Sequence, residues 1–229
     1  MGTLAFQTLT ITLVTSVSYV LGLRLFRQLN RTFLNPLFTA TLFMVVLLSV
    51  LKIDYHMFAE GTRVFTFLLN TATVALAIPL YKQWQLLRKN LNQIVLSISL
   101  GHGVGIASAV ILAKTINLND HLLTSLIPKS VTIPVALSLS QALGGVTSFT
   151  VLFVLTSALF SITCGPKLLS LCGIKSNLAK GLALGASAQV LGATKAMKWG
   201  EEAGAMGSVG MTASAILLCL IFPLLVHIV

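Results

Sequence analysis

Four apolar segments follow one another in the first half of the chain, and short polar stretches separate them. They cover about residues 4 to 23, 32 to 51, 64 to 81 and 91 to 113. An α-helix that crosses a bilayer needs about 20 mainly apolar residues, so each segment is long enough to cross a membrane or nearly so. The pattern therefore predicts four transmembrane helices before residue 120.

The apolar pattern changes after residue 120, where helix-breaking residues enter the segments. Residues 121–143 are apolar on average but hold Pro128, Lys129 and Pro134 near the middle. Pro134 removes a helical hydrogen bond and Pro128 disfavours helical geometry at the residue before it, and the freed backbone groups cannot face lipid unpaired. This stretch is therefore predicted to be a broken helix that is buried in protein or lines a wet cavity.

A second irregular stretch covers residues 177–200, between apolar segments at about 146 to 172 and 204 to 228. It holds four glycines together with polar side chains that include Gln189 and Thr194. The glycines alone would also fit a continuous helix that packs tightly against its neighbours. Gln189 and Thr194 close to a glycine favour a second break over that alternative.

Composition strengthens the membrane interpretation and leaves no room for a soluble catalytic domain. Of 229 residues, 56% are hydrophobic and 9% are charged, with a mean hydropathy of +0.96, whereas soluble domains carry about 25% charged residues. We expect an all-α polytopic membrane protein with about 6 to 8 transmembrane helices, two broken or re-entrant segments and an inverted repeat. A single transmembrane domain would cover residues 1–229, with halves at about 1–120 and 121–229.

Basic residues gather at the ends of the apolar segments, where they predict which loops face the cytoplasm. The net charge is +10, with 15 Lys and Arg against 5 Asp and Glu. In a soluble protein this charge would suggest nucleic acid, but here it fits loop orientation and contact with the lipid bilayer, so no nucleic-acid partner is expected. Arg24, Arg27 and Arg31 follow the first segment, which places the N-terminus outside.

Charge also bears on how the two irregular stretches enter the membrane. If residues 121–143 and 177–200 both cross, the loop with Lys167, Lys175 and Lys180 lies outside, against the positive-inside tendency. If each stretch dips in and returns to its own face, that loop lies inside and the stretches enter from opposite faces, as an inverted repeat predicts. The re-entrant arrangement is preferred, and crossed broken helices are the alternative.

Lys129 is the main candidate for binding chemistry, because a lysine at the centre of a transmembrane helix costs about 2.5 to 3.5 kcal/mol on insertion scales. Ser130 and Thr132 follow it with hydroxyl groups. A half-helix that begins at this break would direct free N–H groups and its positive dipole end toward the same place, forming an anion site. The alternative is a lysine that snorkels to the interface from a shallow break.

Other polar residues within the segments have structural as well as functional explanations. Asn70 and Thr71 could bond across helices or contact a substrate. His102, between two glycines in the fourth segment, could carry a proton, although a lone histidine among small residues is more often packed and hydrogen-bonded.

The sequence shows no pattern typical of a catalytic or metal centre. All five acids lie at segment ends, and no nucleophile has a matching base. The three cysteines have no ligand spacing and form no disulfide framework, so neither a metal nor a cofactor is expected. An intramembrane enzyme is therefore disfavoured.

Several short motifs, in order along nearly the whole chain, make it similar to the LrgB/CidB family. They are Leu34-Asn35-Pro36-Leu37, Asp54-Tyr55 followed by Phe58 and Gly61, VALAIPLY over 74–81, IPKSVTIPVA over 127–136, Gly144-Gly145, and Lys180-Gly181-Leu182-Ala183 with Gly185. The resemblance implies a multi-pass protein of the bacterial cytoplasmic membrane, or of the chloroplast inner envelope. It implies one of two activities: an antiholin-like effect on murein hydrolase activity and autolysis with a small LrgA/CidA-type partner, or transport of small carboxylates such as pyruvate, glycolate or glycerate.

Two positions depart from the family pattern, because Gln189 stands where the family usually has a histidine and Thr71 where it has a proline. A glutamine cannot carry a proton near neutral pH, which puts proton coupling through that position in doubt.

The preferred hypothesis is a secondary carrier of small monocarboxylates with elevator-like alternating access, the movement being inferred by analogy with the family. The predicted substrate contacts are Lys129, Ser130, Thr132, Gln189, Thr194, Asn70 and Thr71. A holin-like pore or regulatory membrane partner is the alternative. We also expect a homo-oligomer, with a dimer favoured.

Overall fold

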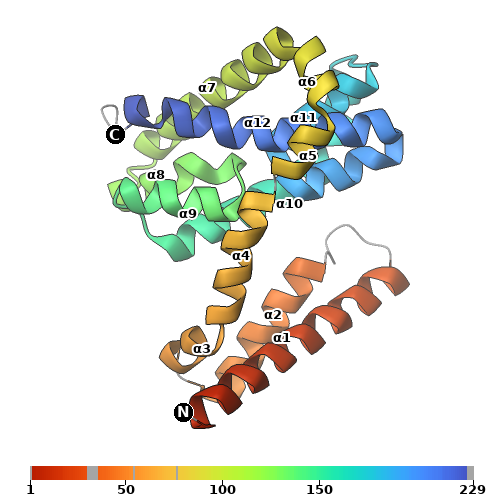
Figure 1. Ribbon diagram of the computed structural model, residues 1–229. Helices are drawn as coiled ribbons and strands as arrows, with labels where there is room; N and C mark the ends of the chain where they lie inside the picture. The colour runs from red at the N-terminus through yellow and green to blue at the C-terminus, as the bar shows by residue number, and fades with distance from the viewer. Residues whose placement is uncertain (1, 30–35, 54, 76, 226–229) are drawn as a thin grey trace. The chain divides into compact units, whose positions relative to one another are not determined.

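The computed structural model describes residues 2–29, 36–53, 55–75 and 77–225. Every regular element in these ranges is a helix (Figure 1). Contacts divide the chain into two compact units, Met1–Val74 and Ala75–Val229. The all-α polytopic class predicted from the sequence is confirmed.

The first unit is built on a pair of packed helices. Its described elements are α1 (Gly2–Leu29), α2 (Pro36–Val50), α3 (Tyr55–Gly61) and α4 (Arg63–Ala75), whose last residue falls just past the unit boundary. α1 packs against α2, where the buried Ser18 hydroxyl lies 3.2 Å from the Met44 sulfur. One turn further, a Cβ on Gly22 would lie 2.6 Å from the Thr39 hydroxyl oxygen, so a glycine is needed for this close approach.

Helices cover most of the second and third apolar segments predicted from the sequence. α2 begins at Pro36, a residue favoured in the first turn because its missing N–H has no helical partner there. It ends before Lys52, whose φ of 50° turns the chain so that the Ile53 N–H donates to the Leu48 carbonyl over 3.1 Å. α2 lies within the predicted segment at about 32 to 51, and α4 together with α5 (Ala77–Lys82) covers the described part of the predicted segment at about 64 to 81.

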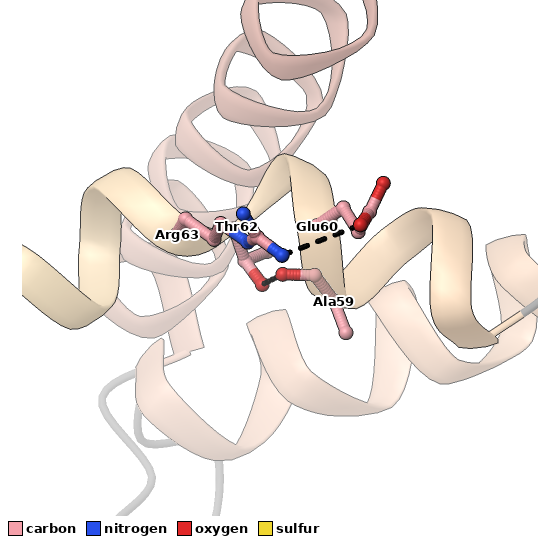
Figure 2. Close-up of polar contacts among 4 residues, drawn as sticks. All are labelled: Ala59, Glu60, Thr62 and Arg63. Atoms are coloured by element: carbon pink, nitrogen blue, oxygen red, sulfur yellow. Dashed lines mark hydrogen bonds and ion pairs between the residues drawn. The ribbon is translucent and has the colours of Figure 1, made fainter. Parts of the chain in front are cut away.

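The turn between α3 and α4 is held by short polar contacts (Figure 2). The Thr62 hydroxyl donates to the Ala59 carbonyl over 3.0 Å, and the Arg63 guanidinium donates to the Glu60 carboxylate over 3.3 Å. Both charged side chains are exposed, so the ion pair contributes at most about 1 kcal/mol to stability.

The second unit holds the broken segments. Its elements are α5 (Ala77–Lys82), α6 (Trp84–Lys89), α7 (Leu91–Thr115), α8 (Asp120–Leu126), η2 (Ile127–Ser130), α9 (Ile133–Ala142), α10 (Thr147–Leu171), α11 (Asn177–Ala196), η3 (Met197–Trp199) and α12 (Glu201–Leu225). In the part of the chain that the structure describes, four helices are long and apolar enough to cross a membrane. They are α1 over Thr8–Gln28, α7, α10, and α12 over Glu201–Ile221.

Residues 120–144 form a first hairpin rather than a crossing helix. The ring Nδ1 of His121 and the backbone carbonyl of Gly144 are 2.8 Å apart and hydrogen-bonded, although 23 residues separate them. A continuous helix would place such residues about 35 Å apart. The reversal occurs at η2, where Pro128 has non-helical angles, and at the extended Val131 and Thr132. The predicted break at these prolines is confirmed.

Residues 177–199 form a second hairpin. The Asn177 side-chain amide donates to the Trp199 carbonyl over 3.1 Å across 22 residues. The reversal lies at Gln189, which has φ 55° and ψ −131° in the middle of α11. A Cβ on Gly192 would overlap the Leu184 carbonyl, which shows that the two arms of α11 lie side by side. The second break is therefore confirmed, and both broken stretches return to the end from which they start.

The two hairpins begin at opposite ends of α10. The first ends just before Thr147, the second begins after Leu171, and the 25 residues of α10 between them rise about 37 Å. Val154 of α10 packs with the tip of the first hairpin, and Ala158 and Ile162 pack with Ala188 near the tip of the second. Both tips therefore reach the middle of α10.

The order of hairpin followed by long helix occurs twice, over 120–171 and 177–225. The two copies start at opposite ends of α10, which is the element order of an inverted repeat. Both copies lie after residue 120, so the division into halves at that residue stays a prediction.

α12 packs along the second hairpin (Figure 1), and the backbones of the two elements are in close contact. A Cβ on Gly181 would overlap the Ala203 carbonyl, and one on Gly185 would overlap the Gly207 carbonyl. The glycines of this stretch thus serve close packing as well as the break, so the packing interpretation and the break interpretation both hold.

Candidate functional site

A cavity of about 400 Å³ lies where the two hairpin tips approach α7. Its polar lining comes from three elements: Ser97 and His102 on α7, Ser130 on η2, and Ser187 on α11. η2 and α11 are in contact, so the two tips meet here as re-entrant segments that enter from opposite ends. The volume lies within the range of roughly 300–1,000 Å³ that is usual for small-molecule sites.

The cavity extends from the tips toward one end of the unit. Along the first arm of α11, its lining runs from Ile174 before the helix through Ala179 and Ala183 to Ser187, at a spacing of about one helical turn. Gly101 also lines it, and a Cβ on that glycine would meet no other atom within 4 Å. The cavity therefore extends along the second hairpin from its base to its tip.

An apolar cluster occupies the other side of the first hairpin tip. Ile127, Val131, Ala136, Val154 and Leu218 pack together there, and Val131 and Ala136 are fully buried. None of these residues lines the cavity. The structure is thus open from the base of the second hairpin and filled by side chains toward the base of the first.

Several buried polar atoms in the second unit have no hydrogen-bond partner among the described residues. They are Nε2 of His102, Oγ1 of Thr132, Nε2 of Gln189 and Oγ of Ser214. Each side chain is at most 8% exposed. Leaving such a group unpaired costs about 1–3 kcal/mol. Of the four residues, His102 lines the cavity, where a ligand can meet it.

The packing of α12 shows where Ser214 lies relative to the two hairpin tips. In α12, Gly210 packs against Leu182 and Ala186 of the second hairpin, and Leu218 packs against the first hairpin cluster. Ser214 lies one turn from each of these two residues. It therefore lies at the level where the two tips meet.

Lys129 lies at the tip of the first hairpin, in a 3-10 turn, and is half-buried. Its neighbour Ser130 lines the cavity, whereas Lys129 itself does not. Thr132 precedes the first residue of α9 and its hydroxyl caps no backbone N–H of that helix. The interrupted backbone predicted around Lys129 is confirmed, and binding of an anion by its ammonium group stays a prediction.

Gln189 occupies a strained position at the tip of the second hairpin. A φ of 55° with ψ of −131° is a region that non-glycine residues rarely adopt, at a cost of about 1–3 kcal/mol. The side chain is 8% exposed and its Nε2 is unpaired. Strain and an unsatisfied polar group on the same residue are typical of functional positions.

Thr194, another predicted contact, is not among the residues that line the cavity. Thr194 lies on the second arm of α11, is exposed, and donates its hydroxyl to the Val190 carbonyl over 2.8 Å. Thr71 on α4 donates to the Phe67 carbonyl over 3.0 Å, and the side chain of Asn70 lies outside the described residues. Roles of these three residues in substrate binding stay predictions.

Three residues that line the cavity were not among the substrate contacts predicted from the sequence: Ser97, His102 and Ser187. For His102 the signal in the sequence was its position between Gly101 and Gly103 within an apolar segment. For the serines the sequence held no signal, because single serines are common in transmembrane helices and their orientation is set by packing.

The two ends of the second unit differ in charge. At the end with the base of the second hairpin, basic residues outnumber the two acids Glu201 and Glu202: Arg88, Lys89, Lys167, Lys175, Lys180 and Lys198. Leu87, Ile94 and Leu178 belong to one apolar cluster, which shows that the start of α7 shares this end. The opposite end holds Lys114, Asp120 and His121. The cavity thus opens at the basic end.

Chemically the site offers hydroxyl and imidazole groups but no carboxylate among its lining residues. Within the described ranges, no three His, Cys, Asp or Glu side chains gather as they would around a metal ion. Donors without acids suit a ligand rich in acceptor oxygens.

A polytopic helical membrane protein with two re-entrant hairpins that meet at an internal cavity is therefore the class that the fold and site define. Comparison with known proteins gives the family. The profile of the LrgB-like family matches residues 15–228, and the chain belongs to this family.

Relatives match over nearly the full length of both chains. The chain is 37% identical to the uncharacterized protein YxaC of Bacillus subtilis over 216 residues, 94% of each protein. It is 31% identical to the holin-like protein CidB of Staphylococcus aureus over 220 residues, 96% of each. No solved structure matches the chain.

Proposed function

We propose that the protein is a secondary carrier of small carboxylates. The observation that carries the proposal is the cavity between the tips of two hairpins that start at opposite ends of α10. Transporters with inverted repeats bind substrate near the bilayer midplane, where discontinuous helices meet. A pore formed by assembling helices requires no such pair of re-entrant tips.

The chemistry of the lining favours an anion with several acceptor oxygens. Ser130 and Ser187 can donate from the two tips, and His102 can donate from α7. Thr132 and Gln189 add unpaired polar groups at the same tips. A carboxylate with a neighbouring oxygen, as in pyruvate or glycolate, would accept from groups on both hairpins at once.

Lys129 and the basic end would support binding electrostatically. A half-buried ammonium at the first tip raises the local positive potential, and lysines around the base of the second hairpin attract anions to the open end of the cavity. By the positive-inside rule the basic end would face the cytoplasm of a bacterial cell. The structure would then correspond to a state open to the cytoplasm.

Transport requires the opposite state as well. In our proposal the second hairpin and α12 move as one body, because their backbones are in contact through glycines. The apolar cluster around Val131 would separate and open a path to the other face. The carrier thus alternates access around a binding site that both tips share.

Uptake of labelled pyruvate or glycolate into proteoliposomes tests the proposal. Gly101→Ala adds a methyl group inside the cavity, whereas Gly103→Ala adds one two residues away on the same helix, into space that is also open but does not line the cavity. We expect Gly101→Ala to raise KM by about tenfold and Gly103→Ala to leave it unchanged. Equal KM values for both variants and the native protein would contradict this placement of the site.

Lys129→Ala provides a second variant at the same site. If Lys129 supports carboxylate binding as we propose, its loss should lower kcat/KM for uptake by about ten- to a hundredfold, corresponding to roughly 1.4–2.7 kcal/mol. Full activity of Lys129→Ala would remove this residue from the site.

A holin-like activity is the second candidate, and the similarity to the holin-like protein CidB of Staphylococcus aureus favours it directly. In that case the protein would form or regulate a lesion in the membrane, with a small membrane partner of the LrgA/CidA type and as a homodimer. Release of a trapped fluorescent dye from proteoliposomes would support the holin-like candidate. Saturable carboxylate uptake without dye release would support the carrier.

A further inference from the structure

We propose that His102 carries the proton that crosses the membrane together with the carboxylate. This inference rests on the proposed carrier function and adds to it the coupling ion and the residue that holds it. His102 lines the cavity between the hairpin tips, is 8% exposed, and has an Nε2 atom without a hydrogen-bond partner.

The position of His102 suits a group that binds ligand and proton together. It lies 11 residues after the start of α7, which has 25 residues, and therefore about 17 Å along a helix of about 37 Å, near its middle. The open space beside Gly101 and the hydroxyls of Ser130 and Ser187 surround the same cavity. A small carboxylate in this cavity would lie beside the His102 side chain, whose Nε2 has no hydrogen-bond partner.

His102 is the one titratable side chain among the described residues that line the cavity. Charged groups occur on each element that packs against α7, and all of them lie outside the lining: Asp120 and His121 on α8, Lys129 on η2, Arg88 and Lys89 on α6, and Glu201 and Glu202 on α12. Lys180 on the first arm of α11 faces the Trp199 ring, 5.7 Å from its centroid. Gln189 at the second tip has no proton to exchange near neutral pH.

Coupling follows from the cost of burying a charge. An imidazolium alone in this cavity would be an unpaired charge in a place of low polarity, whereas a bound carboxylate neutralises it. The proton and the carboxylate would enter from one side, with the proton on Nε2 donating to a carboxylate oxygen. Both would leave on the other side, and the empty carrier would return with a neutral histidine.

The test separates net transport from exchange. Proteoliposomes with an acidic exterior drive net uptake of labelled pyruvate by a proton-coupled carrier, with about tenfold accumulation per pH unit for one proton per carboxylate. Counterflow against unlabelled internal pyruvate needs no net proton movement. We expect His102→Gln, which keeps a donor of similar size, to lose the accumulation driven by the pH gradient and to retain counterflow within about threefold.

Ser187→Ala is the control variant, because it also alters the cavity lining but removes no titratable group. It should keep the accumulation ratio of the native protein even if its KM changes. A pH-sensitive dye inside the vesicles provides a readout without any substitution: carboxylate uptake by the native protein should acidify the interior beyond that of protein-free vesicles.

The outcomes are distinguishable. If native protein shows neither saturable uptake nor counterflow, the carrier function fails. If native protein transports pyruvate without internal acidification, or if His102→Gln accumulates pyruvate to the native ratio, the carrier stands and proton coupling through His102 is overturned. If His102→Gln loses counterflow as well, the dye readout on the native protein decides whether a proton is carried.

Discussion

The side-chain amide of Asn177 donates a hydrogen bond to the backbone carbonyl of Trp199 over 3.1 Å, and this bond joins the first and last residues of the second hairpin. Lys180 covers the ring of the same tryptophan at 5.7 Å. The base of the hairpin is therefore fastened at the end of the molecule where the cavity opens.

Removal of this bond should loosen the hairpin base. We expect Asn177→Ala to lower the free energy of unfolding by about 0.5–1.5 kcal/mol, the net value of a typical hydrogen bond. Asn92→Ala is the control, because Asn92 is also an exposed asparagine in the first turn of a helix, and no cap bond by it is seen. Thermal unfolding in detergent, followed by circular dichroism, measures both. A similar effect of both variants would mean that the bond does not fasten the base.

The stability difference between a glycine and an alanine variant at position 189 has one sign in a hairpin and the opposite sign in a continuous helix. At a φ of 55°, glycine is tolerated without strain, so Gln189→Gly should be more stable than Gln189→Ala by about 1 kcal/mol or more. In a continuous helix, alanine would be the more stable by about 1 kcal/mol. The melting temperatures of the two variants, compared in the same detergent, distinguish these cases.

The close packing of α11 on α12 predicts a large effect of a single methyl group. A Cβ on Gly185 would overlap the Gly207 carbonyl, so Gly185→Ala must push the two helices apart and should cost about 1–3 kcal/mol. Gly103→Ala adds the same methyl group where no atom lies within 4 Å, and should leave stability unchanged or raise it slightly. Equal stabilities would show that α11 and α12 are further apart than the structure places them.

The two hairpin bases should be accessible from opposite sides of the membrane. In a protein whose three cysteines are replaced, Gln141→Cys reports on the first hairpin and Ser176→Cys on the second, since both positions are exposed. If the basic end faces the cytoplasm, a membrane-impermeant maleimide should label position 141 in intact cells and position 176 only after permeabilisation. Labelling of both positions from the same side would show that α10 does not separate the two bases.

The sequence predicted the membrane class and the place of both breaks, because these depend on local properties. Two prolines within seven residues prevent a continuous helix wherever the segment lies, and apolar length alone indicates α7, α10 and α12 as spans. It also predicted the segments in which α2, α4 and α5 lie, because runs of apolar residues are a local property as well.

Whether the broken segments cross or return was decided by tertiary structure. The bonds from His121 to Gly144 and from Asn177 to Trp199 join residues more than 20 positions apart, and no local pattern encodes such pairs. The same holds for the meeting of His102 with Ser130 and Ser187 around one cavity. Which face of a helix points inward depends on its neighbours, because in a membrane both faces are apolar enough to meet lipid.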